Sequence, residues 1–226
     1  MGISLGLGGI ICSGSTIVFP LTKSWPPSPV DVIDTLHRAD VNSCVMVPSL
    51  LEQVVTALQE TPISQHDSNG TSSTLLPLIN LRILLVGGAH CPDHLAEYLI
   101  TNGVNLRSVY GSTEAGHMMV GNHQRSAGNK TSWKLMRPIP HTSLILKPVK
   151  DDTSLERQLF EVHMSPRDPR IAPYVLKSED PEETWNTGDV VEQFPMDSGW
   201  YRLLFREDDI LVHDNGEYTY NIMLNY

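Results

Sequence analysis

Apolar residues recur at helical and at strand-like spacing along the first part of the chain. Residues 29–39 carry them every three to four positions, which predicts an amphipathic helix. The apolar run at residues 43–47 predicts a strand, and the pattern after Pro48 predicts a second helix. Residues 61–74 are rich in Ser, Thr, Asn and Gly without periodicity, so we expect a solvated loop there.

A strand, a helix and a second strand follow this loop. Residues 81–86 are almost continuously apolar, as in a strand that is covered on both faces. Pro92 suits the first position of a helix, and residues 106–110 form the next predicted strand. This spacing predicts a βαβ unit with parallel strands. Ligands bind at the carboxyl ends of such strands, where the turns beginning at Gly87 and Gly111 lie.

Beyond Trp133 the pattern changes to short β-type segments separated by Pro and Gly, which indicates antiparallel strands. These segments are residues 144–146, 158–162, 190–194, 200–205 and 210–212. The expected fold class is therefore α/β, with a parallel βαβ sheet in residues 1–130 and a smaller antiparallel β region in residues 131–226.

The uncharged stretch at residues 1–22 resembles a signal peptide or a membrane span only superficially. It lacks a basic start and is interrupted by several glycines. We interpret it as a buried helix followed by a strand at residues 16–19. Three cysteines without C-x-x-C spacing indicate a reducing compartment, so a cytoplasmic location without membrane partners is expected.

Composition narrows the function classes further. The chain has 226 residues, 40% of them hydrophobic, and a net charge of -10, which is typical of one or two ordinary soluble domains. Its 16 Lys and Arg residues are scattered rather than clustered. Nucleic-acid binding requires clustered basic residues that contact phosphates, so this class is excluded.

Two common sites fit the sequence poorly. Gly111 and Gly116 have the spacing of a phosphate-binding P-loop, but His117 stands where that motif needs Lys. His90 and His94 are four residues apart and could share a metal, although the start of a helix attracts such polar residues for capping alone.

A more specific signal comes from five short motifs in a fixed order. They are residues 86–89 (VGGA), 110–114 (YGSTE), 186–189 (NTGD), 206–209 (REDD) and 215–217 (NGE). In this order they resemble the adenylate-forming (AMP-binding) superfamily, which includes acyl-CoA synthetases and nonribosomal-peptide adenylation domains. The resemblance is closest to fungal nonribosomal-peptide-synthetase-like adenylation proteins. Taken singly, each motif also has a structural explanation, such as a core Tyr or a Gly turn.

The resemblance implies a role for each of two glycine-containing turns. Gly87, Gly88 and Ala89 would let adenine approach the backbone, because larger side chains would block it. Tyr110 would stack on the adenine face. Gly111 and Ser112 would belong to the same cofactor-binding turn.

The remaining roles concern the phosphates, the metal and the ribose. Thr113 would hydrogen-bond the α-phosphate, and Glu114 would hold Mg²⁺ as a hard oxygen ligand, so these two are the expected catalytic residues. Asp189, assisted by Arg206, would accept hydrogen bonds from the ribose hydroxyls. Asp208 would be the hinge of a small C-terminal subdomain.

The resemblance implies ATP-dependent activation of a carboxylic acid as an acyl-adenylate, in fungal secondary metabolism, with ATP and Mg²⁺ as cofactors. The implied partners are the acid substrate and carrier-protein or reductase modules on other chains. The family's phosphate loop ending in Lys has no match in residues 1–19, and the C-terminal subdomain with its Lys has none either. We therefore expect a partial, inactive version of the enzyme. A non-catalytic remnant or scaffold and an incomplete gene model are the alternatives.

Overall fold

The computed structural model describes residues 15–23, 25–60, 74–121, 132–140, 142–149, 157–176, 183–206, 210–212 and 218–220. The chain forms two compact units. The first comprises Met1–Val109 and His123–Trp133, and the second comprises Tyr110–Asn122 and Lys134–Tyr226. Each unit therefore contains two separate stretches of the sequence.

The first unit is an α/β arrangement whose three strands run parallel. They are β1 (Ser43–Met46), β2 (Ile83–Gly87) and β3 (Leu106–Ser112), with β2 in the centre. The helix α5 (Asp93–Thr101) connects β2 to β3. The predicted βαβ unit is thus confirmed, including its parallel strands. The strand β3 begins in the first unit and ends in the second.

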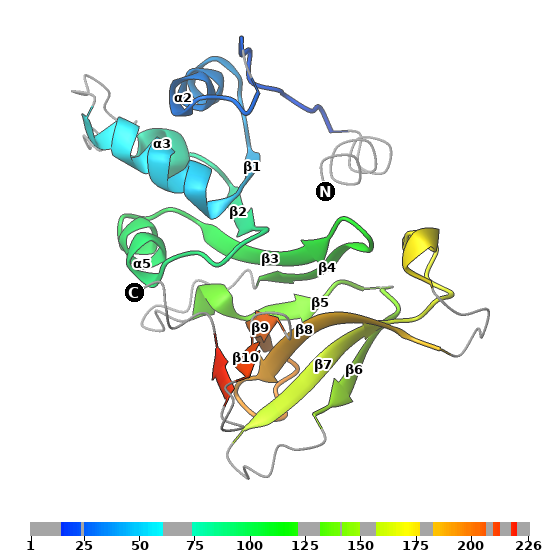
Figure 1. Cartoon of the computed structure of the whole chain (residues 1–226). Coiled ribbons are helices and arrows are strands. Elements are labelled where there is room, and N and C mark those ends of the chain that lie inside the picture. The colour runs from blue at the N-terminus through cyan, green and yellow to red at the C-terminus, as the bar shows by residue number, and fades with distance from the viewer. Residues whose placement is uncertain are drawn as a thin grey trace. The chain divides into compact units, whose positions relative to one another are not determined.

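Helices supply the other half of the first unit's core. The helix α2 (Pro29–Arg38) packs on α3 (Pro48–Glu60), and the two lie beside each other in Figure 1. A short helix, α4 (Leu76–Ile79), precedes β2. Fully buried side chains from three elements, Leu51, Leu84 and Leu99, meet in one cluster. Each such burial contributes about 1.5 to 3 kcal/mol of the hydrophobic stabilisation.

The start of α2 shows how local sequence fixes an element. The hydroxyl of Ser28 accepts a hydrogen bond from the backbone N–H of Asp31, and the Asp31 carboxylate accepts one in return from the Ser28 N–H. This reciprocal cap satisfies two N–H groups that a helix start leaves unpaired. It places the helix start where the sequence predicted it, next to Pro29.

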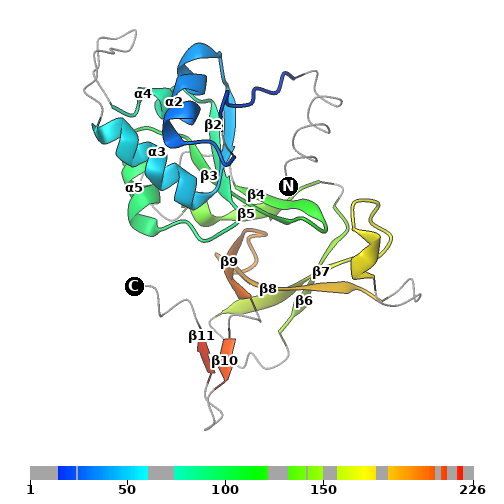
Figure 2. The ribbon, with the colours of Figure 1, turned by 45° about the horizontal axis from the view of Figure 1, so that its top comes forward.

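The second unit is built from antiparallel strands in the order β4-β5-β9-β8-β7-β6. Their bounds are Gly116–Gly121 (β4), Met136–Pro138 (β5), Leu144–Pro148 (β6), Gln158–Met164 (β7), Trp185–Gln193 (β8) and Tyr201–Arg206 (β9). Figure 2 shows β6, β7 and β8 as neighbouring strands. A separate antiparallel pair is formed by β10 (Ile210–Val212) and β11 (Tyr218–Tyr220).

The second unit has its own apolar core and two short 3₁₀ turns near it. The turn η3 (Pro173–Val175) belongs to this unit, whereas η2 (Ser132–Lys134) contains the boundary between the units. The core side chains are Tyr110, Ala115, Met118, Met119, Met136, Val162, Met164, Ile171 and Val191. Four of these residues are methionines. The methionine side chain is flexible and fills irregular gaps between strands.

Some predicted elements need correction. Residues 16–19 form no strand, and Phe19 is 72% exposed, so the apolar composition there does not reflect a covered strand. The strand β8 begins at Trp185 rather than at residue 190. The sequence pattern missed its first residues because Thr187 and Asp189 are polar but buried. The predicted helix before residue 15 and nearly all of the predicted loop at 61–74 lie outside the described residues.

Within the described ranges, no helix is both long enough and apolar enough to cross a lipid bilayer.

Candidate functional site

The end of β2 carries the first predicted motif, and its two glycines have distinct structural reasons. A Cβ at Gly87 would collide with the carbonyl oxygen of Val109 and would lie 2.7 Å from the Val109 Cγ1. Gly88 has a φ of +86°, a conformation that side-chain-bearing residues rarely adopt. The next residue, Ala89, is exposed. The two glycines thus allow β2 to end close to β3 and turn outward.

The second motif spans the end of β3 and the turn into β4. A Cβ at Gly111 would collide with the carbonyl oxygen of Gly116, so the two ends of the turn approach each other closely. Inside the turn, the hydroxyl of Ser112 accepts a hydrogen bond from the backbone N–H of Ala115 at 3.2 Å. Thr113 is exposed at the turn's tip. We refer to residues 113–117 as the Glu114 turn.

Glu114 itself is partly exposed and carries a charge that its surroundings favour. A backbone hydrogen bond within its own residue lowers the pKa of the Glu114 carboxyl below its ordinary value, and hydrogen bonds with Ser112 and Tyr174 act in the same direction. The Tyr174 hydroxyl donates to Glu114 Oε1 over 3.4 Å. An ionised carboxylate on an accessible turn can bind a hard cation.

A buried hydrogen bond joins the end of β3 to β8. The hydroxyl of Tyr110 donates to Asp189 Oδ2 at 2.6 Å, and each of the two residues is only 6% exposed. Burial raises the pKa of the Tyr110 hydroxyl above its ordinary value, and the negative charge of Asp189 raises it further. The phenol therefore stays protonated and keeps donating to the carboxylate.

Arg206 approaches the same carboxylate from β9, where it is paired in register with Asp189. Its Nε lies 3.5 Å from Asp189 Oδ1, and its Nη2 donates to the backbone carbonyl of Thr187 at 3.3 Å. About half of the Arg206 side chain is exposed. Solvent weakens the attraction of such a pair, so Arg206 orients the carboxylate more than it stabilises the fold.

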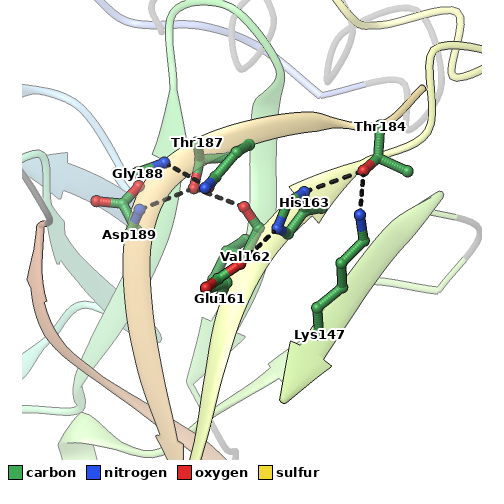
Figure 3. A network of polar contacts seen from close by, with 9 residues as sticks. Lys147, Glu161, Val162, His163, Thr184, Thr187, Gly188 and Asp189 are labelled. Atoms are coloured by element: carbon green, nitrogen blue, oxygen red, sulfur yellow. Dashed lines mark hydrogen bonds and ion pairs between the residues drawn. The ribbon is translucent and has the colours of Figure 1, made fainter. Parts of the chain in front are cut away.

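Thr187 belongs to the NTGD motif, where the sequence suggests no role for it, and it lies at the centre of these contacts. Its hydroxyl donates to the carbonyl of Val162 at 3.0 Å and accepts from the Asp189 N–H at 3.2 Å. The Tyr110 hydroxyl lies 3.3 Å away. Figure 3 shows Thr187 on β8, with its hydroxyl bonded to Val162 of β7. A bifunctional hydroxyl at this position can fix the donor and acceptor directions of its neighbours.

A second polar network continues along the same two strands in Figure 3. The ring of His163 lies between the Thr184 hydroxyl, 3.0 Å from Nδ1, and the Glu161 carboxylate, 3.1 Å from Nε2. Lys147 on β6 donates to the same Thr184 hydroxyl at 2.7 Å. These contacts hold the chain that leads into β8, because they join its first residues to β6 and β7.

The structure brings together most of the predicted nucleotide residues that lie in the second unit. Tyr110, Asp189 and Arg206 form one hydrogen-bonded and ion-paired group, and the Glu114 turn follows directly on the strand that carries Tyr110. Gly87, Gly88 and Ala89 belong to the first unit. The predicted hinge residue, Asp208, lies outside the described residues. The roles of all these residues in nucleotide binding stay predictions.

A further polar atom at the Glu114 turn was missed by the sequence analysis. The Nε2 atom of His117 is buried and has no hydrogen-bond partner among the described residues. Burial lowers the pKa of the His117 imidazole, so the ring is neutral near pH 7. In the sequence it was considered only as the residue that excludes a P-loop.

Metal binding at this site would depend on the substrate. No three His, Cys, Asp or Glu side chains cluster as metal ligands within the described ranges. Glu114 fits a magnesium ion nonetheless, because Mg²⁺ is usually held by one or two carboxylates together with substrate phosphates and water. A single ionised carboxylate on an accessible turn meets that requirement.

Solved structures share this arrangement of strands and helices. O-succinylbenzoate coenzyme A synthetase (MenE) from Bacillus subtilis, solved with ATP and magnesium, matches with a TM-score of 0.58 and 20% identity over 88% of this chain and 39% of that one. The amide bond synthetase McbA from Marinactinospora thermotolerans matches with a TM-score of 0.59 and 20% identity, covering 87% of this chain and 38% of its own. The fold is that of part of an adenylating enzyme.

The sequence comparison gives the family itself. The profile of the AMP-binding enzyme family matches residues 1–158, and the chain belongs to this family.

Curated relatives are fungal and considerably longer. Adenylate-forming reductase Nps9 of Serpula lacrymans is 25% identical over 200 residues, which cover 88% of this chain and 16% of that protein. The AMP-binding domain-containing enzyme iboA of Amanita muscaria is 25% identical over 197 residues, which cover 78% of this chain and 36% of that protein. The chain thus spans well under half the length of these relatives.

Proposed function

We propose that the second unit carries the ribose and metal part of a site that activates a carboxylic acid with ATP. The supporting observation is the Asp189 carboxylate, which is buried, hydrogen-bonded by Tyr110 and faced by Arg206. A carboxylate fixed in this way is an oriented acceptor for two neighbouring hydroxyl donors, as the ribose of ATP presents them.

In the proposed reaction, a carboxylate oxygen of the substrate attacks the α-phosphorus of ATP. A new bond forms between this oxygen and the α-phosphorus. The bond from the α-phosphorus to the oxygen that bridges the α- and β-phosphates breaks, and pyrophosphate leaves with the electron pair of that bond. Thr113 would donate its hydroxyl to an α-phosphate oxygen, and Glu114 would hold Mg²⁺. The bound metal would neutralise the negative charge that develops on the phosphate oxygens.

Each residue's surroundings suit its assigned part. Thr113 lies exposed at the tip of the Glu114 turn, where its hydroxyl is accessible to a ligand. Glu114 is held in its ionised form by hydrogen bonds. The backbone of the turn is fixed by the close approach of Gly111 to Gly116. Preformed geometry matters here, because catalysis by positioned charges requires little rearrangement during reaction.

The acid substrate and later steps belong to the whole protein. We expect the substrate to be a carboxylic acid whose acyl group then passes to a carrier-protein or reductase module. The name of the relative Nps9, an adenylate-forming reductase, agrees with the reductase alternative. His117, the last residue of the Glu114 turn, contributes a neutral ring whose Nε2 has no hydrogen-bond partner in the part of the chain that the structure describes. Its chemistry suits a polar group on a ligand rather than a purely apolar one.

Binding of ATP to the 226-residue chain, measured by calorimetry, tests the proposal. Asp189→Asn should weaken ATP binding by about 10- to 150-fold, corresponding to about 1.5 to 3 kcal/mol for a hydrogen bond to a charged group. Glu183→Gln is the matched control, since Glu183 is an exposed acid just before β8. For wild type, 2′,3′-dideoxy-ATP should bind more weakly than ATP, and Asp189→Asn should abolish that difference. Equal affinities of wild type for both nucleotides would contradict the proposal.

A further inference from the structure

The segment of residues 168–172, which follows β7, is hydrogen-bonded to two backbone carbonyls of the Glu114 turn. The backbone N–H of Ala172 donates to the carbonyl of Glu114 at 2.7 Å. Arg170 Nη1 donates to the carbonyl of His117 at 3.3 Å. These two carbonyls lie three residues apart, so one short segment holds the turn that presents the Glu114 carboxylate.

The anchor of this segment is a buried carboxylate. Asp168 is 2% exposed and accepts hydrogen bonds from the Ser143 N–H at 3.0 Å and from the Arg170 N–H at 3.0 Å. Its Oδ1 also accepts from Arg170 Nε at 2.9 Å, while its Oδ2 accepts from Arg170 Nη2. Removing a carboxylate from water is unfavourable by several kcal/mol unless its oxygens are paired as fully as they are here.

The pairing fixes the direction of the Arg170 side chain. Two nitrogens of the planar guanidinium bind Asp168, and the remaining one is thereby aimed at the His117 carbonyl. A lysine has no such planar fork and could not bind the carboxylate at two points while reaching the carbonyl. The contact from Asp168 to the turn therefore depends on arginine geometry rather than on positive charge alone.

We propose that Arg170 is a positioning residue for Glu114, which it places for Mg²⁺ by fixing the backbone of the Glu114 turn. The inference rests on the proposed function, because it assigns the metal to Glu114. Arg170 touches neither nucleotide nor metal in this scheme. Its effect reaches the metal only through the carbonyl of His117 and the backbone of the Glu114 turn, which ends at that residue.

Magnesium-dependent ATP binding to the 226-residue chain tests this inference. Arg170→Lys should raise the Mg²⁺ concentration that gives half of the maximal gain in ATP affinity by about fivefold to tenfold, the effect of losing one hydrogen bond of ordinary strength. Affinity for ATP without Mg²⁺ should change less than about twofold, because the ribose contacts remain. Arg170→Gln should act in the same direction. Arg167→Lys, a change of an exposed arginine in the same segment, is the control.

A second arm separates positioning from general stability. In a Glu114→Gln background, Arg170→Lys should have no further effect on the Mg²⁺ requirement, because the two residues act in series. Loss of Mg²⁺-free ATP binding in Arg170→Lys, or an undiminished effect in the Glu114→Gln background, would overturn the inference. So would an unchanged Mg²⁺ requirement in Arg170→Lys or in Glu114→Gln. If wild type binds no ATP, or Asp189→Asn binds it normally, the proposed function fails as well; otherwise only Arg170's role is lost.

Discussion

Tyr110 and Asp189, separated by 79 positions in the sequence, share a hydrogen bond of 2.6 Å in the interior of the second unit. The donor belongs to β3 and the acceptor to β8. A phenol that donates to a buried carboxylate stabilises the ionised acid without adding a second charge. The bond is therefore both a packing contact and a means of keeping an anion at the candidate site.

Replacing Tyr110 by Phe removes this donor and leaves the ring's packing in place. We expect the free energy of unfolding at pH 7 to fall by about 1.5 to 3 kcal/mol, since the lost bond involves a charged, buried acceptor. Urea unfolding of wild type and variant measures the difference. Tyr201→Phe is a suitable control, because the Tyr201 hydroxyl accepts from the neutral Gln193 side chain instead. An equal loss in both variants would show that the charge of Asp189 does not matter.

The same pair predicts a loss of stability at alkaline pH. The pKa of Tyr110 is raised in the folded chain above its ordinary value of 10.0, so between these two values the unfolded state releases a proton that the folded state keeps. The contribution of Tyr110 to the free energy of unfolding is fully present below pH 10 and is lost as the pH rises beyond that value. Tyr110→Phe should show a smaller decline above pH 10. A parallel decline in wild type and Tyr110→Phe would exclude Tyr110 as its source.

Asp168 should control the acid side of the stability profile. Hydrogen bonds from Arg170 lower the pKa of Asp168 in the folded chain below its ordinary value of 3.8. Its contribution is thus present above pH 3.8 and is lost as the pH falls below that value. Asp168→Asn should reduce the free energy of unfolding at pH 7 by about 3 kcal/mol, as for a broken buried pair, and should flatten the decline below pH 4. Denaturant unfolding at several pH values measures both; an unchanged acid slope would contradict the assignment.

Alanine and asparagine should rank in opposite order as replacements for Gly87 and for Gly103. Gly87→Ala places a methyl group against Val109, so we expect a loss of about 1 to 3 kcal/mol from overpacking, and Gly87→Asn should be worse. Gly103 has open space around it but a φ of +90°, so Ala there should cost about 1 to 2 kcal/mol from backbone strain. Gly103→Asn should recover part of that loss, since Asn tolerates positive φ. Chemical unfolding of the four variants checks this, and recovery by Asn at position 87 would refute it.

The 226-residue chain should not catalyse exchange between pyrophosphate and ATP. The described residues assigned to the nucleotide would hold the ribose, the α-phosphate and the metal, whereas the chain spans only 39% of the ATP-bound synthetase it resembles. Loss of even one group that stabilises the transition state typically lowers the rate by about 100- to 1000-fold. The assay combines the purified chain with Mg-ATP, labelled pyrophosphate and a panel of aryl, α-keto and amino acids. Exchange above that of Glu114→Ala would disprove the prediction.

Local patterns in the sequence were sufficient for the βαβ unit. The apolar run before Gly87 and the helix after Pro92 have no competing explanation, and β2, α5 and β3 appear close to their predicted places. The start of β8 was missed because its polar residues face inward, where Thr187 and Asp189 find partners on other strands. Alternation of polar and apolar residues cannot reveal a strand whose polar side chains are buried.

The supporting contacts of the site were beyond sequence reasoning for a different reason. Motif order identified Tyr110 and Asp189 as candidates, but their mutual hydrogen bond depends on strands far apart in the sequence. Arg170 and Asp168 carry no motif, and a charged pair at spacing two is usually a solvated surface feature. Only the burial of Asp168 and the direction of the third guanidinium nitrogen reveal their connection to the Glu114 turn.

The division of the chain into two units has a practical consequence for protein dissection. Each unit is assembled from two stretches, and β3 changes from one unit to the other between Val109 and Tyr110. A cut at that point would break a strand and separate Tyr110 from the residues that precede it in the sheet. Neither unit can therefore be expressed as one continuous fragment. Isolating the second unit would require joining residues 110–122 directly to residue 134 with a short designed loop in place of the segment between them.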